Sequence, residues 1–249
     1  MGVCIQMAAN ERSFSARTEA APLRCIAARR RGDLESAFRL IYERYHHDGL
    51  ADWSPRGVRI LPHQLLDTSW VLLARRGRRL YGTLSLVEDG AMGLPMEQLY
   101  PAEIWRLRRQ EKRVAELACF ALWEKSASEN RSVLRALLDS ACRIAVERAI
   151  DEVVICVHPR RAAFYERRLG FQEIGATRCC PWVCNQPAVA MKLALTTSNR
   201  TDAVTARQAE ADSRWPSTAP TQLRRADRAY FLRLLDSAPA MTRVQRVAA

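Results

Sequence analysis

The sequence predicts an α/β (α+β) protein in which helices cover the faces of a mixed β-sheet. Between residues 22 and 196, short apolar stretches alternate with amphipathic ones in the order strand, helix, several strands, long helix, strand, helix, strands. This alternation within one stretch of chain is typical of a sheet with helices packed against it. A hydrophobic content of 48% in 249 residues supplies enough apolar side chains for a sizeable core.

Turn and cap signals divide the first half of this region. Arg76-Gly77-Arg78 is short and contains glycine, so it predicts a hairpin between the strands that flank it. Asp33 precedes apolar residues at helical spacing and predicts the cap of a helix that runs through Tyr45. The expected elements are a strand at 23–28, this helix, hairpin strands at 69–75 and 79–89, and a helix in the second part of 95–109.

The second half contains the longest predicted helix. Its apolar stripe is formed by Leu134, Leu137, Leu138, Ala141 and Ile144. A short basic helix follows the next strand and ends at Gly170, which supplies a left-handed C-cap. The expected elements are a strand at 113–123, the long helix at 129–150, a strand at 152–157, the basic helix at 159–169, and strands at 171–178 and 188–195.

The two ends of the chain differ in composition from its middle. Residues 1–21 and 197–221 are polar, rich in small residues and without a clear period, so we expect a flexible N-terminal arm and a flexible linker on either side of the domain at 22–196. Residues 222–249 predict an appended amphipathic helix and tail. Because the last expected strand ends near residue 195, we expect residues 197–249 to be dispensable for the chemistry.

The chain is strongly basic, with a net charge of +12 and 36 arginines among its 39 basic residues. Such a surplus favours an acidic partner, which could be an acidic protein, a nucleic acid or an anionic surface. The sequence shows neither a secretory signal nor an apolar run near 18 residues, so we expect a cytoplasmic protein without a membrane span. A peripheral membrane contact stays open.

The eight cysteines follow no pattern of paired CxxC units. Cys179, Cys180 and Cys184 could form a metal cluster, but small apolar side chains near a strand end are the better interpretation. We therefore expect no metal.

Four stretches carry a resemblance to a known family. They are YGTLSLVEDGAMGLPMEQLY (81–100), VAELACFAL (114–122), VHPRRAAFYERRLGF (157–171) and NQPAVAMKL (185–193). The strand, FY-containing helix and GF of the third stretch resemble the last motif of the GNAT acyltransferases. Together the four resemble the bacterial long-chain N-acyl amino acid synthases, which are relatives of the acyl-homoserine lactone synthases. The resemblance covers about residues 25–195 and implies a mixed, mostly antiparallel central sheet flanked by helices.

Glu116 is the candidate general base. In the resemblance it lies on the strand that splays beside the thioester and often carries the base. Between Ala115 and Leu117 a carboxylate is costly unless it is solvated or paired, and desolvation would raise its pKa. The attacking ammonium must lose a proton, whereas a thiolate leaves easily, so the base matters more than the acid. The alternative is that Glu116 pairs with one of the many arginines.

The same resemblance assigns further roles around the thioester. The backbone N–H groups near Cys119 or Phe120 would bind the oxyanion if the strand bulges there. Tyr165 would face the leaving sulfur, although core packing is an equal alternative. His158 is more easily explained by the strand-to-helix turn, but its place at the carboxyl end of a strand makes it a substrate-binding candidate.

An absent motif agrees with the donor that the resemblance implies. Coenzyme A enzymes of this fold hold the pyrophosphate on a glycine-containing loop before the long helix, and this sequence has no glycine from Leu94 to Leu169. The family's donor, the acyl-phosphopantetheine of acyl carrier protein, has no pyrophosphate, and no bound cofactor is expected. The acidic carrier would dock on arginines that otherwise form a solvated face. The docking candidates are Arg131, Arg135, Arg160 and Arg161.

The resemblance implies transfer of a long fatty acyl chain to the α-amine of a free amino acid. Trp53, Thr83 and Asp89 are candidates for binding the amine because they come from strand ends and the long loop. One alternative is a conventional GNAT enzyme that uses acyl coenzyme A on a small amine. The other is a non-enzymatic basic GNAT-like module, but no recognition helix or stacking aromatics support a nucleic-acid partner.

Overall fold

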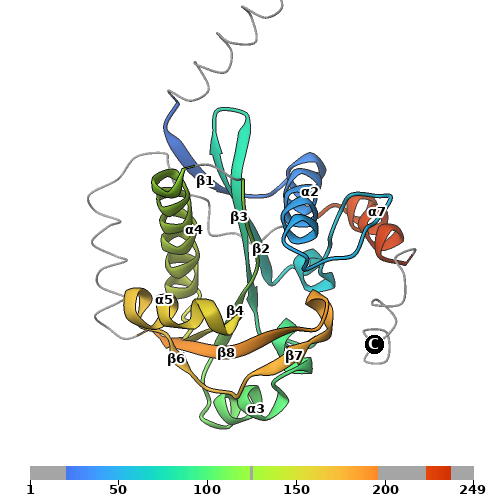
Figure 1. Ribbon diagram of the computed structural model, residues 1–249. Coiled ribbons are helices and arrows are strands. Elements are labelled where there is room, and N and C mark those ends of the chain that lie inside the picture. The colour runs from blue at the N-terminus through green and yellow to red at the C-terminus, as the bar shows by residue number, and fades with distance from the viewer. Residues whose placement is uncertain (1–20, 124–125, 196–222, 237–249) are drawn as a thin grey trace, which may run out of the picture.

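A computed structural model describes residues 21–123, 126–195 and 223–236 (Figure 1). The strands are β1 (Leu23–Ala27), β2 (Ser69–Arg76), β3 (Arg79–Glu88), β4 (Val114–Leu122), β5 (Glu152–Val157), β6 (Gln172–Glu173), β7 (Arg178–Cys180) and β8 (Gln186–Ala194). The helices are α2 (Arg31–His47), α3 (Pro101–Arg109), α4 (Ala127–Glu147), α5 (Pro159–Leu169) and α7 (Arg225–Asp236), with short 3₁₀ turns η1 (Pro62–Leu65), η2 (Pro95–Gln98) and η3 (Pro181–Val183). The element order follows the prediction closely.

The sheet has the order β1-β2-β3-β4-β5-β8-β6, and β7 pairs with β8 outside this path. Every pairing is antiparallel except that of β4 with β5, which confirms a mixed, mostly antiparallel sheet. The parallel pairing runs only from Val114 opposite Glu152 to Leu117 opposite Ile155. Beyond that point the two strands continue without pairing, which opens the sheet at its centre.

Both faces of the sheet are covered, as strand periodicity dictates. In β2, Trp70 and Leu72 join the core under α4, while Val71 and Leu73 join a second core under α2. All four side chains are fully buried. Figure 1 shows α4 and α2 on opposite faces of the sheet, so the opening between β4 and β5 lies between two helical layers.

The predicted caps are partly confirmed. Gly170 ends α5 with a φ of 76°, as the left-handed cap requires. The prediction for Asp33 is wrong: Arg30 is the N-cap of α2, and Asp33 lies in the first turn. There its carboxylate pairs with Arg75 of β2 at 3.2 Å, so the side chain ties the helix to the sheet instead of capping it.

Helix α7 packs into the core on the α2 face. Phe231 is fully buried, and its ring meets the edge of Phe38 at 5.3 Å. Arg56 donates a hydrogen bond to the Leu234 carbonyl at 2.7 Å, which ties the loop after α2 to this helix. Removing residues 197–249 would therefore expose apolar side chains of the core, so the expectation that this segment is dispensable has to be revised. The predicted arm, apart from Ala21, and the predicted linker lie outside the described residues.

Within the described part of the chain, no helix has the length and apolar character needed to cross a bilayer.

Candidate active site

A cavity of about 1030 Å³ opens where β4 and β5 separate. Its walls come from both strands, from α4 and α5 on one side, and from α2, the loop after α2 and α7 on the other. The turns η2 and η3 close it further. A cavity of this size at the centre of an open sheet is the natural place for a substrate.

The floor of the cavity is a β-bulge in β4. Thr83 of β3 faces Ala121 and Ser85 faces Ala118, so β4 has one residue more than its partner over this interval. Cys119 lies within it at a φ of 53°. Because pairing with β5 has already ended at Leu117, the backbone at this bulge borders the cavity. The bulge expected after Glu116 is therefore present, in the position where an oxyanion would need donors.

Glu116 lies on the cavity wall immediately before the bulge and is only 4% exposed. Its Oε2 atom accepts a hydrogen bond from the Met96 N–H at 2.7 Å. Burial raises the pKa of the carboxyl to about 8, and the Met96 hydrogen bond lowers it by less. Among the described residues no basic side chain forms an ion pair with Glu116, which disfavours the alternative of an arginine partner. A carboxyl with this pKa can exchange a proton near neutral pH.

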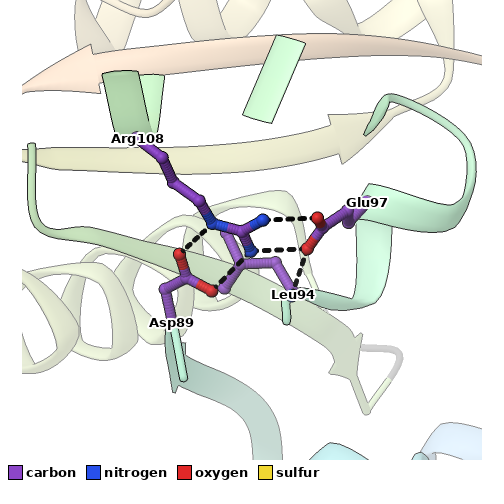
Figure 2. A network of polar contacts seen from close by, with 4 residues as sticks. All are labelled: Asp89, Leu94, Glu97 and Arg108. Carbon is purple, nitrogen blue, oxygen red and sulfur yellow. Dashed lines mark hydrogen bonds and ion pairs between the residues drawn. The ribbon is translucent and has the colours of Figure 1, made fainter. Parts of the chain in front are cut away.

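The Met96 N–H is held in place by a network around Arg108 (Figure 2). The guanidinium binds both oxygens of Asp89, at 2.7 and 2.8 Å, and also both oxygens of Glu97. Glu97 in turn accepts from the Leu94 N–H at 3.3 Å. Arg108 thus joins the end of β3, the turn η2 and helix α3. The turn that donates to Glu116 is consequently fixed by charge-assisted bonds.

Two of the predicted amine-binding residues lie elsewhere. Asp89 is occupied by Arg108, and it is absent from the cavity wall. Thr83 is fully buried, and its Oγ1 donates to the Leu72 carbonyl at 2.9 Å. Both predictions are corrected for the same reason: each side chain already satisfies a structural partner. Trp53, by contrast, borders the cavity with 71% of its surface exposed.

Tyr165 and His158 both border the cavity from α5. The Tyr165 ring packs edge-on against Phe164 and Phe171, and burial raises the pKa of its phenol, so the hydroxyl stays protonated. The His158 side chain caps α5, since its Nδ1 accepts from the Arg160 N–H at 3.2 Å. Tyr165 therefore combines packing with a position facing the cavity, and His158 positions the helix.

The four docking candidates separate into two pairs. Arg131 and Arg161 border the cavity, on the α4 and α5 side. Arg135 and Arg160 are exposed outside it, and Arg135 pairs with Asp139 at 3.6 Å. Phe120, the second oxyanion candidate, borders the cavity at the bulge.

Three thiols also face the cavity, from Cys119, Cys156 and Cys180. Burial raises all three pKa values, that of Cys119 to about 12, so these groups are neutral thiols and poor nucleophiles. Cys179 and Cys184 are exposed while Cys180 is buried, and the described residues contain no cluster of three or more potential metal ligands.

Sequence reasoning missed Arg59, Met96, Arg108 and Leu234. Arg59 and Leu234 border the cavity from segments far apart in the chain. Arg108 is one of many arginines on an amphipathic helix, and Met96 contributes only a backbone group. The one signal for Arg59 in the sequence is that a charged residue stands among apolar ones in the long loop before η1.

The same architecture occurs in solved acyltransferase structures. FeeM, an N-acyl amino acid synthase from uncultured soil microbes, is similar with a TM-score of 0.60 and 26% identity over 71% of this chain and 93% of FeeM. BjaI, a CoA-dependent acyl-homoserine lactone synthase, has a TM-score of 0.53 and 16% identity over 86% of this chain and 100% of its own. The acyl-homoserine lactone synthase LasI has a TM-score of 0.51 and 15% identity over 71% and 92%. At their identities the last two show the shared fold alone.

Fold and site together define a GNAT-like acyltransferase. The sequence profile of the N-acyl amino acid synthase FeeM matches residues 36–194, well over half of the chain. The protein therefore belongs to the FeeM N-acyl amino acid synthase family. No curated protein matches the sequence.

Proposed function

We propose that this enzyme transfers a long fatty acyl chain from acyl carrier protein to the α-amine of a free amino acid. The amine nitrogen forms a bond to the thioester carbonyl carbon, and the carbon–sulfur bond breaks. An acyl thioester and an ammonium thus give an amide, a thiol and one released proton. The observation that carries the proposal is a buried, unpaired Glu116 beside the β4 bulge in a largely apolar cavity.

Glu116 acts as the general base in this mechanism. In its ionised form it accepts a proton from the ammonium, directly or through a water, so that the neutral amine can attack. A pKa of about 8 leaves a usable fraction ionised near neutral pH and makes the carboxylate a stronger base than an exposed one. The Met96 N–H binds Oε2 and keeps the carboxylate oriented, and Oε1 has no hydrogen-bond donor among the described residues.

The β4 bulge acts on the carbonyl oxygen of the thioester, and Tyr165 acts on its sulfur. Backbone N–H groups at Cys119 and Phe120 stabilise the oxyanion as it forms. The protonated Tyr165 hydroxyl borders the cavity from α5, and it would supply a proton to the departing sulfur. Since a thiolate with a parent pKa of about 8.5 leaves readily, Tyr165 contributes less than Glu116.

The start of α4 supports a carrier-protein donor. In coenzyme A enzymes of this fold a pyrophosphate binds at this helix N-terminus, and here no glycine precedes it. Ser126 is instead the N-cap of α4. Its Oγ accepts a hydrogen bond from the Glu129 N–H and donates one to the Glu129 carboxylate at 3.0 Å. A carboxylate in the first turn disfavours a pyrophosphate at this helix end, whereas a phosphopantetheine arm has no pyrophosphate to place there. BjaI, which shares the fold, is named as CoA-dependent, so acyl coenzyme A is the alternative donor.

Initial rates with the same acyl chain on acyl carrier protein and on coenzyme A test the donor. We expect the carrier to be used far better and its rate to fall with salt, because exposed charges are screened over about 8–10 Å at ordinary ionic strength. Arg135→Glu and Arg160→Glu should weaken use of the carrier by roughly tenfold. Arg24→Glu, on the exposed far edge of the sheet at β1, is the matched control. Equal rates from both donors, or a carrier rate indifferent to salt, would favour the conventional acyl coenzyme A reaction.

A further inference from the structure

Arg59, like the candidate base Glu116, borders the largely apolar cavity, and it places a positive charge on the wall. It lies in the loop between α2 and η1, where its backbone N–H donates to the Phe38 carbonyl at 3.0 Å. Its guanidinium donates to the Trp182 carbonyl and lies 5.1 Å from the centre of the Tyr45 ring. The backbone bond, the carbonyl and the ring hold the side chain in one place.

The charge of Arg59 has no acidic partner among the residues that the structure describes. A half-buried cation without a counter-ion is costly, and the one carbonyl bonded to it leaves most of its five N–H donors available. A fixed guanidinium with free donors matches a carboxylate, which it can bind through two parallel hydrogen bonds. The missing counter-ion therefore points to an anionic group of a substrate.

Arg59 borders the same cavity as the candidate base Glu116 and the β4 bulge. The thiols of Cys119 and Cys180 border this cavity too. Burial is the main reason that the pKa of each thiol is raised; the Arg59 charge lowers each pKa and the Glu116 charge raises it further. These two cysteines thus lie within electrostatic range of the candidate base and of the guanidinium. A molecule that bridges the two groups needs a basic nitrogen and a carboxylate a short distance apart, which describes an α-amino acid.

The anion that Arg59 binds belongs to the acceptor rather than to the donor. The donor's arm and phosphate would approach past Arg131 and Arg161, which border the cavity from the α4 and α5 side. Arg59 contacts Phe38 and Tyr45 of α2, and α2 lies on the face of the sheet opposite to α4 (Figure 1). The sheet opening lies between Arg59 on one side and Arg131 and Arg161 on the other. Arg59 can therefore bind the acceptor while the other two bind the donor.

We propose that Arg59 binds the α-carboxylate of the acceptor and thereby selects free amino acids over simple amines. This inference rests on the proposed acyl transfer to an amine. It names the residue that recognises the carboxylate next to that amine. Binding the carboxylate at Arg59 directs the α-nitrogen toward Glu116 and the bulge.

The experiment compares a free amino acid with its own carboxamide, which keeps the α-amine and removes the negative charge. The acceptor is the best of the twenty standard amino acids with wild-type enzyme. Wild type should prefer the acid by roughly 10- to 100-fold in kcat/KM, the usual worth of a charged hydrogen-bonded pair. Arg59→Met should lose this preference through a higher KM for the acid, with little change for the amide. Arg59→Lys should be intermediate, and the exposed Arg39→Met of α2 should behave as wild type.

The outcomes separate this inference from the proposed function. If wild type uses acid and amide equally, or if Arg59→Met slows both to the same extent, Arg59 holds the loop and does not bind the carboxylate, while acyl transfer stands. If wild type acylates no amine at all, the proposed function itself fails. Activity of Arg59→Met on the amide also reports that the variant is folded.

Discussion

Two buried glutamates on neighbouring strands show how the same side chain serves different ends. Glu116 of β4 and Glu152 of β5 are 4% and 5% exposed. Glu152 pairs with Lys192 of β8 at 3.2 Å, within the fully paired part of the sheet. Glu116 lies next to the point where the sheet opens, and among the described residues the Met96 N–H is its hydrogen-bond donor. Burial is common to both residues, so what supports the proposed base is burial without a cation at the wall of a cavity.

Exchanging each glutamate for glutamine should give the largest difference between the two residues. Glu116→Gln should lower kcat/KM by roughly 10²- to 10⁴-fold, because it removes a general base without changing the size of the side chain. Glu152→Gln should leave activity near wild type. It should cost about 1–3 kcal/mol in the free energy of unfolding, because it leaves Lys192 without its partner. Steady-state kinetics and denaturant unfolding measure the two effects, and a folded Glu116→Gln enzyme with wild-type activity would remove Glu116 from the mechanism.

Loosening the turn that contacts Glu116 should have a smaller effect. Arg108→Met leaves Asp89 and Glu97 facing each other without a cation, so η2 and its Met96 N–H shift. We expect kcat/KM to fall by about 10- to 100-fold, and its pH midpoint to rise, since the Met96 bond lowers the pKa of Glu116. Arg106→Met, on the exposed side of the same helix, is the control. An unchanged pH midpoint would mean that Arg108 only stabilises the fold.

The smallest effect is expected at the leaving group. Tyr165→Phe removes a hydroxyl and keeps the ring contacts with Phe164 and Phe171. Because the thiolate leaves without much help, kcat should fall by about tenfold at most. If Tyr165→Phe lost as much activity as Glu116→Gln with the same donor, protonation of the leaving sulfur would matter as much as deprotonation of the amine.

Most of the fold could be predicted from the sequence because it depends on local patterns. Alternating apolar residues mark β2 and β3, and the stripe from Leu134 to Ile144 marks α4. Glu116 was found because a carboxylate in an apolar strand conflicts with its surroundings, and the family resemblance gave it a role. The β4 bulge was expected from the resemblance alone.

The remaining features depend on contacts between distant segments. The Met96 N–H is 20 residues from Glu116 in sequence, and Arg108 joins groups from three elements. Phe231 follows a long stretch of polar sequence, and nothing local indicates that it packs against Phe38. Thr83 and Asp89 looked available because their structural partners, Leu72 and Arg108, are not adjacent in the chain.

Titration of the Glu116 side-chain carboxyl by carbon NMR tests the central claim most directly. Because its folded-state pKa is raised, the group stays protonated through neutral pH and ionises as pH rises through about 8. The unfolded chain ionises near 4.5, so this carboxyl destabilises the fold increasingly between those two values. We expect a midpoint near 8 that disappears in Glu116→Gln, and a rise in the kcat/KM of wild type over the same pH range. A midpoint below about 5, the ordinary range for glutamate, would contradict this expectation.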